Sequence, residues 1–201
     1  GDDTFAGGGA GDTVNATATT LTSGDNINGA AGVDTLAITG GGSISLATPA
    51  SLLSIENVTI DNAATTLTLG NAARSVTVAV GTGAHSFVLG DGSAIQNVNG
   101  GGGNDTFTVA SNATESNLTL TGGTGTDVFV ITGTAGGIDL TTMAGFSGFE
   151  SLTLASGGDI AMNAGQNNAF TGTISAAGSN VVTISGDGAV TQTLAGVETY
   201  T

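Results

Sequence analysis

A nine-residue pattern of glycines, one aspartate and one large apolar residue constrains this 201-residue chain more than any other feature. Segments 100–108 (GGGGNDTFT) and 122–130 (GGTGTDVFV) fit the pattern G-G-x-G-x-D-x-U-x completely, where U is the large apolar residue. Segments 29–37 (GAAGVDTLA) and 7–15 (GGGAGDTVN) fit it with an alanine in place of one glycine. The pattern predicts a tight, glycine-rich turn that leads directly into a strand.

Apolar residues elsewhere recur at a short and regular step. Leu69, Val78, Leu89, Val98 and Phe107 are separated by 9, 11, 9 and 9 residues. One strand of about five residues and its turn use about ten residues together. The regularity therefore predicts an all-β, parallel β-helix or β-roll solenoid, in which each turn covers the apolar face of its neighbour. An antiparallel sandwich has similar spacing and remains an alternative at this point.

Three segments occur twice in the same order, which indicates a duplicated unit. The copies are GDDTF (1–5) and GNDTF (103–107), GAAGVDTLAI (29–38) and GGTGTDVFVI (122–131), and LSIENVTI (53–60) and FSGFESLTL (146–154). A partial third copy of the last segment, LAGVETYT, ends the chain. We expect one continuous solenoid, with a first unit and additional rungs over residues 1–99 and a second unit plus the start of a third over residues 100–201.

The composition of the repeated turn points to calcium. Glycines allow the backbone to turn tightly and bring carbonyl oxygens inward, and the aspartate adds a carboxylate to them. A hard cation that takes 6 to 8 oxygen ligands suits this donor set, so we predict several bound Ca²⁺ ions. Asp3 and Asp25 join the candidates because each precedes a motif aspartate by nine residues. The predicted metal-binding residues are Asp3, Asp12, Asp25, Asp34, Gly100, Gly101, Gly103, Asn104, Asp105, Gly122, Gly123, Gly125 and Asp127.

The charge balance excludes some partners and supports others. Lys plus Arg is 1 and Asp plus Glu is 16, which gives a formal net charge of -15. A chain with one basic side chain cannot neutralise nucleic-acid phosphates, so we expect no nucleic acid as partner. Apolar runs are too short for a transmembrane helix. The chain begins GDDTF, without an initiator Met or a signal-peptide segment, so we expect it to be part of a larger protein.

The motifs resemble the RTX (repeats-in-toxin) proteins, which depend on calcium and leave Gram-negative bacteria by type I secretion. The order of NDTF, TDVF and a closing hydrophobic-Glu segment such as GFESLTL is similar to modules of Caulobacter-type surface-layer (S-layer) proteins. The resemblance implies an extracellular, self-assembling coat protein at the bacterial cell surface, in which Ca²⁺ drives folding and lattice assembly. It implies the chain itself as main partner, and lipopolysaccharide as an anchor bound through regions outside these residues.

The residues of the chain also bear on functions other than a coat. The chain has no Cys, one His and no G-x-S-x-G motif, so we predict no catalytic residues and no enzymatic activity. A spacer or ligand-binding module of a large RTX adhesin, or an accessory RTX module of a secreted enzyme, remains an alternative. An ice-binding solenoid needs threonine at one position of many rungs, and Thr35, Thr106 and Val128 share a position without such a run.

Five further residues each allow two roles. Glu56, Glu150 and Glu198 recur at one place in the repeated unit, where they either supply calcium ligands or accept backbone N–H groups at a turn. His85 is the only histidine, and we expect it to be solvated or structural, as we do for Arg74, the only basic residue.

Overall fold

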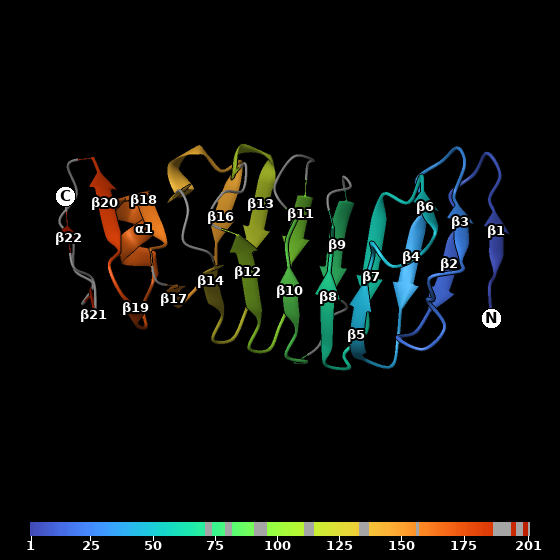
Figure 1. Cartoon of the computed structure of the whole chain (residues 1–201), viewed down its shortest axis with the longest axis horizontal. Helices are drawn as coiled ribbons and strands as arrows, with labels where there is room; N and C mark the ends of the chain where they lie inside the picture. The colour runs from blue at the N-terminus through green and yellow to red at the C-terminus, as the bar shows by residue number, and fades with distance from the viewer. Residues whose placement is uncertain are drawn as a thin grey trace.

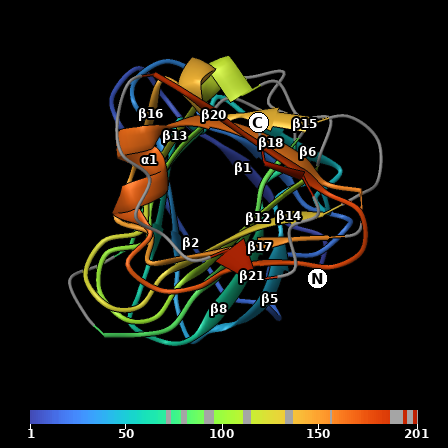
Figure 2. The same ribbon diagram turned by 90° about the vertical axis from the view of Figure 1, so that its left-hand side faces the viewer.

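A computed structural model shows the chain as a parallel β-solenoid of about 7 turns. The structure describes residues 1–70, 74–78, 82–90, 96–110, 115–132, 137–155, 157–186, 194–195 and 199–200. The strands lie across the long axis of the molecule, with the two ends of the chain at opposite ends of the stack (Figure 1). Viewed along this axis, the turns superpose around a common centre (Figure 2).

The strands form four parallel sheets. Sheet A consists of β1 (Thr4–Ala6), β3 (Asn26–Asn28) and β6 (Ser51–Leu53). Sheet B consists, in sequence order, of β2 (Thr13–Ala16), β4 (Thr35–Ile38), β7 (Asn57–Ile60), β9 (Arg74–Val78), β11 (Gln96–Asn99), β13 (Leu118–Thr121) and β16 (Gly145–Ser147). Sheet C consists of β5 (Gly42–Ser45), β8 (Thr65–Thr68), β10 (Ser86–Val88), β12 (Thr106–Ala110), β14 (Val128–Thr132), β17 (Ser151–Leu154), β19 (Ile174–Ala176) and β21 (Leu194–Ala195). Sheet D consists of β15 (Gly137–Asp139), β18 (Asp159–Asn163), β20 (Val181–Ser185) and β22 (Thr199–Tyr200).

Every strand pair in these sheets is parallel, which confirms the predicted fold class and excludes the alternative of an antiparallel sandwich. In sheet B, Thr13 pairs with Thr35, and in sheet C, Thr106 pairs with Val128. The two residues of each pair are 22 positions apart in the sequence, so one full turn takes 22 residues at these places. Sheets B and C both extend through the middle of the molecule, whereas sheet A belongs to the N-terminal turns and sheet D to the C-terminal ones (Figure 1).

A column of large apolar side chains fills the interior along sheet C. Leu67, Phe87, Phe107 and Phe129 occupy paired positions on successive strands and are fully buried. The rings of Phe87 and Phe107 have centroids 4.8 Å apart, and Phe149 adds an edge contact to Phe107 at 4.9 Å. Burial of each such side chain stabilises the fold by about 1.5–3 kcal/mol. The apolar residues two places after Asp105 and Asp127 therefore point into the core.

Within the described residues, three short helices interrupt the strands. The 3₁₀ helices η1 (Glu115–Asn117) and η2 (Leu140–Thr142) lie between strands, and α1 (Ala164–Ala169) follows β18. In chain order, α1 takes the place of the next sheet B strand, and it packs against β16, the last strand of that sheet. A capping box of Asn163 and Gln166 begins α1. No helix among the described residues is long and apolar enough to cross a membrane.

Candidate functional site

The glycine at the first position of the motif gives space to the aspartate at the sixth. A Cβ atom on Gly100 would lie 2.5 Å from the Asp105 Oδ2 atom and 2.5 Å from the carbonyl oxygen of Gly122, one turn further on. Real Cβ atoms do not approach other atoms this closely, so only glycine fits. The same close approach recurs at Gly7, beside Asp12, and at Gly29. The motif therefore places a carboxylate oxygen and a carbonyl oxygen together against a bare Cα atom.

The motif aspartates stack into ladders along the solenoid axis. In the first ladder, Asp12 donates its backbone N–H to Asp34 Oδ1 at 2.7 Å, and Asp34 donates its own N–H to Glu56 Oε2 at 2.9 Å. Each of these residues directly precedes a strand of sheet B. Asp34 and Glu56 thus each accept a hydrogen bond from the equivalent residue of the preceding turn. These bonds join neighbouring turns in addition to the hydrogen bonds between strands.

The second ladder precedes the strands of sheet C and has four members. His85 donates its backbone N–H to Asp105 Oδ1 at 2.7 Å, and Asp105 donates to Asp127 Oδ1 at 2.8 Å. Asp127 then donates to Glu150 Oε2 at 2.7 Å. The two glutamates therefore act here as N–H acceptors at turns, the second of the two roles considered for them, and Glu198 lies outside the described residues.

The ladders change how the two repeated units align. The sequence comparison paired Asp3 with Asp105, which left unequal spacings from Asp3 to Asp34 and from Asp105 to Asp127. In the structure Asp34 stacks on Asp12, not on Asp3, and this spacing is 22 residues in both units. Asp3 instead belongs to the turns of sheet A, where its backbone N–H binds Asp25 Oδ1 at 2.9 Å. The Asp12 motif, which lacks one glycine, is thus the counterpart of the Asp105 motif.

Three ladder aspartates have one carboxylate oxygen without a partner. The Oδ2 atoms of Asp34, Asp105 and Asp127 are buried and accept no hydrogen bond. Burial, followed by the charge of Asp127, raises the pKa of Asp105 to about 6, although the His85 N–H opposes this. Burial, followed by the charge of Glu150, also raises the pKa of Asp127. A buried carboxylate oxygen without a donor is costly, and a bound cation would offset this cost at all three positions.

Asp25 and Asp12 differ from these three aspartates, because each of their Oδ2 atoms has a hydrogen-bond donor. Asp25 accepts the Thr22 N–H on Oδ2 at 2.6 Å, in addition to the Asp3 N–H on Oδ1. These two donors hold the pKa of Asp25 below its usual value. Asp12 Oδ2 accepts the Gly8 N–H at 2.8 Å. Because both Asp25 oxygens have donors, this carboxylate stabilises its own turn without a cation. The carboxylates that lack a donor are those of Asp34, Asp105 and Asp127.

The remaining predicted site residues build the turns around the second ladder. Gly103 N–H binds the Thr124 carbonyl and Thr124 N–H binds the Gly101 carbonyl, both at 2.9 Å, so two glycine-rich turns stack directly. Asn104 Oδ1 accepts the Thr126 N–H at 2.9 Å. Gly101, Gly103, Gly123 and Gly125 all have positive φ angles, which L-residues with side chains rarely adopt.

The described residues contain no group of three or more Asp, Glu, His or Cys side chains that could hold a metal ion together. The predicted aspartates meet in pairs: Asp3 with Asp25, Asp12 with Asp34, and Asp105 with Asp127. A cation at these turns would therefore take most of its ligands from backbone carbonyls and water, with one carboxylate oxygen from each aspartate. Ca²⁺ accepts such a mixed set of oxygens.

His85 was not predicted as part of the site. Its position was recognisable in one respect, because HSFV at residues 85–88 matches DTFT at residues 105–108 and precedes it by 20 residues. The imidazole takes the place of a carboxylate at this rung, is 3 % exposed, and has no hydrogen bond on either ring nitrogen.

Comparison with known proteins does not place the chain in a family. No protein-family model matches it, and neither curated proteins nor solved structures include a significant match. The class that the fold and the site define is therefore a parallel β-solenoid whose turns carry stacked, buried aspartates.

Proposed function

We propose that this chain is a structural segment of a bacterial extracellular coat, in which Ca²⁺ holds the turns of the solenoid together. One observation carries the proposal: the buried Oδ2 atoms of Asp34, Asp105 and Asp127, which have no donor. Asp105 Oδ2 and the Gly122 carbonyl oxygen lie against the same Cα atom, that of Gly100. A carboxylate oxygen without a donor and a carbonyl oxygen of the next turn, both next to one glycine, occur at Gly29 and at Gly100 and suit a cation that bridges neighbouring turns.

Electrostatics favour a divalent cation at these turns. Two carboxylates about 5 Å apart repel each other by about 3 kcal/mol at an effective dielectric constant of 20. The chain has 16 acidic residues and one basic residue, so its own side chains offset little of this repulsion. Calcium at a concentration 100 times its dissociation constant would stabilise the folded state by about 2.7 kcal/mol per site. In this proposal Asp105 and Asp127 would supply carboxylate oxygens, and Gly122 a carbonyl oxygen.

The coat role follows from the shape and the chemistry of the surface. Parallel solenoids grow by adding equivalent turns, and their faces repeat at each turn. Apart from Arg74, the strands of sheets B and C contain no charged residue, so the acidic residues of the described part lie in turns, in η1 and in sheet D. Two copies can therefore approach through these faces with little repulsion. We propose the chain itself as the main partner, no catalytic activity, and anchoring to lipopolysaccharide through regions outside these residues.

Electron microscopy of the purified protein in millimolar calcium tests the coat role. Sheets with a regular lattice, lost on addition of EGTA, are the expected result. Separate rods of uniform length would contradict a coat and would favour the spacer of an adhesin, since such a spacer needs the extended solenoid but no lateral assembly.

A further inference from the structure

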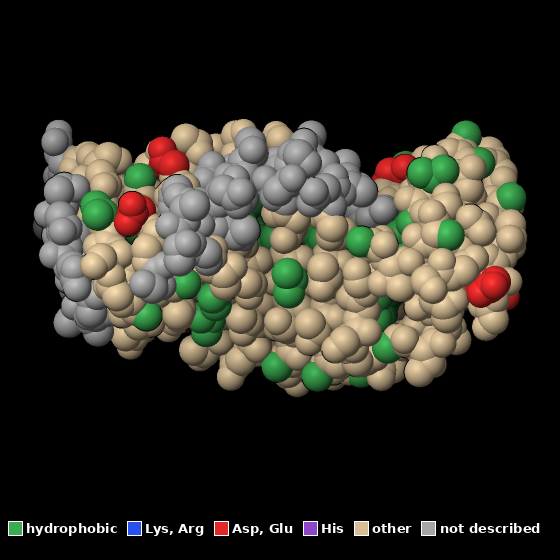
Figure 3. All heavy atoms as spheres, in the orientation of Figure 1, with side chains coloured by type: hydrophobic (Ala, Val, Ile, Leu, Met, Phe, Trp, Pro, Cys, Tyr) green, Lys and Arg blue, Asp and Glu red, His purple; other side chains and the backbone are tan. Residues whose placement is uncertain are grey.

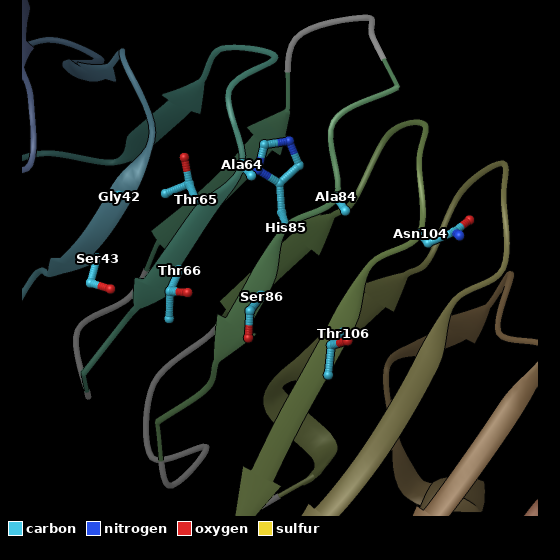
Figure 4. Close-up of a pocket in the computed structure, with 10 residues that line it drawn as sticks. All are labelled: Gly42, Ser43, Ala64, Thr65, Thr66, Ala84, His85, Ser86, Asn104 and Thr106. Atoms are coloured by element: carbon cyan, nitrogen blue, oxygen red, sulfur yellow. The ribbon is translucent and has the colours of Figure 1, made fainter.

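A shallow groove crosses the strands of sheet C on their outer side. It consists of two adjoining hollows of about 360 and 440 Å³, which share Ala84 and Asn104. Ala64 and Ala84 are exposed and sit next to each other where β8 and β10 begin, and their small side chains leave the space open (Figure 4). The groove extends along the solenoid axis from the Gly42 turn to the turn that contains Thr124 and Gly125.

A row of hydroxyl groups follows one side of the groove. Ser43, Thr66, Ser86 and Thr106 occupy paired positions on four successive strands, and all four line the stretch of it shown in Figure 4. Neighbouring strands place these hydroxyls about 4.8 Å apart along the axis. Within the described part of the chain, none of these four hydroxyls forms a hydrogen bond to the protein. Each hydroxyl can therefore both donate and accept a hydrogen bond to a ligand.

His85 adds a buried polar group without a partner at the same place. Its ring projects from the start of β10 toward Ala64 (Figure 4), and both ring nitrogens lie just beneath the surface without a hydrogen bond. The ring nitrogens of an imidazole can form hydrogen bonds with a hydroxyl group.

The groove carries no formal charge, although the chain has a net charge of -15. No Asp, Glu, Lys or Arg is among the described residues that line either hollow. On the face of the molecule drawn in Figure 3, the acidic side chains of the described residues lie toward the two ends. An anionic ligand finds no cation here and is repelled by the molecule as a whole. A cationic ligand finds no carboxylate, so the groove suits an uncharged ligand rich in hydroxyls.

We propose that this groove binds a linear, neutral polysaccharide that lies along the solenoid axis. The strand spacing is close to the rise of one sugar unit in an extended hexose polymer, so successive units meet successive hydroxyls of the row. Asn104 lies at the junction of the two hollows; its Oδ1 is used by the Thr126 N–H, which leaves its NH₂ group as a donor to the ligand. The inference rests on the groove alone and does not depend on calcium or on lattice assembly.

Isothermal titration calorimetry of the whole chain in millimolar calcium tests this site. The probes are maltohexaose, cellohexaose and mannohexaose, with hexagalacturonate as an anionic comparison. We expect binding of at least one neutral hexasaccharide and none of hexagalacturonate. Absence of binding by all three neutral probes at millimolar concentration, or equal binding of hexagalacturonate, would overturn the proposal. Ice shaping by the protein without oligosaccharide binding would also overturn it, because the hydroxyl row would then serve a water lattice.

Matched variants locate the site. Ala84→Phe fills the groove between its two hollows and should weaken binding at least about ten-fold. Ala37→Phe makes the same change on an outward position of β4 in sheet B and should change binding less than about two-fold. His85→Phe retains the backbone N–H that binds Asp105 and should weaken binding while circular dichroism stays unchanged. Equal effects of Ala84→Phe and Ala37→Phe would contradict this location.

Discussion

At the scale of single residues, the predicted aspartates have two different roles. Asp25 has a backbone donor for each carboxylate oxygen and is complete within its turn. Asp105 and Asp127 each have one oxygen that joins two turns and a second oxygen that is buried without a donor. The glycine-rich motif identified Asp105 and Asp127, and the nine-residue spacing to Asp34 identified Asp25. Neither pattern separates the two cases, because the difference depends on which turn lies next to each carboxylate.

Replacing Asp105 by Asn should make the site independent of calcium. The new amide side chain would keep an oxygen for the His85 N–H and place an NH₂ group beside the Gly122 carbonyl. Without calcium, Asp105→Asn should be at least as stable as the parent in urea unfolding at pH 7.5. With calcium, it should gain less stability than the parent, by up to about 2.7 kcal/mol.

The control for this variant is Asp139→Asn, which changes a carboxylate at the start of η2, outside the ladders, to another good helix-capping residue. It should respond to calcium as the parent does. An unchanged calcium response of Asp105→Asn would contradict the role assigned to this carboxylate.

The raised pKa of Asp105 predicts a pH dependence in calcium-free buffer. The folded state holds this proton more tightly than the unfolded chain, whose Asp pKa is about 4. The stabilising contribution is therefore complete below about pH 4 and is lost as the pH rises through the folded value of about 6. The loss amounts to at most about 3 kcal/mol, judged from that shift. Urea unfolding at pH 5 and pH 7.5 measures it.

Other acidic residues also titrate in this range, so the comparison with Asp105→Asn isolates the contribution. The parent should lose more stability than Asp105→Asn between pH 5 and pH 7.5. Identical losses in the two proteins would show that Asp105 holds no extra proton in the folded state.

At the scale of turns and helices, the sequence predicted the strands better than their partners. The step of about ten residues correctly indicated a strand and a turn, because alternating apolar residues and glycines are local signals. Turn length, however, varies: the turn from Asn57 to its partner Ser75 is shorter than the turn from Thr119 to its partner Gly145. Loops absorb these differences without a sequence signature, so the existence of sheets A and D could not be read from periodicity.

A single methyl group at Gly100 should damage a turn. Gly100→Ala would force a Cβ atom against Asp105 and the Gly122 carbonyl, at a cost of about 1–3 kcal/mol in urea unfolding. Gly9→Ala is the matched control, because a Cβ atom at Gly9 meets no atom within 4 Å. Its effect should stay within about 0.5 kcal/mol. Equal effects of the two changes would argue against close packing of the carboxylate on Gly100.

The helix α1 was not predicted, because six residues with the sequence AGQNNA present no apolar stripe. Its start depends on the capping box, in which Asn163 Oδ1 accepts the Gln166 N–H at 2.8 Å. Asn163→Ala should lower the free energy of unfolding by about 1 kcal/mol, whereas Asn163→Ser should lower it much less, because serine is also a good N-cap residue. Thermal unfolding followed by circular dichroism compares the two, and equal losses would show that the cap contributes little.

At the scale of the whole molecule, the ladders and the core column run along the same axis and stabilise it differently. The interior phenylalanines stack without any requirement for a ligand. The ladders place negative charge at the edge of each turn, and only their spacing and burial show which oxygens are unsatisfied. The composition shows the excess of acidic residues, but the pairing of Asp12 with Asp34 and of Asp105 with Asp127 could be recognised only from the register of the turns in three dimensions.

The central claim is that bound calcium stabilises this solenoid, and thermal unfolding with and without calcium tests it most directly. The β signal in circular dichroism should melt at a clearly higher temperature in millimolar calcium than in EGTA at pH 7.5. Magnesium at the same concentration is the control and should stabilise the protein less, because it requires stricter octahedral geometry. A melting temperature that is the same in calcium and in EGTA would contradict the account.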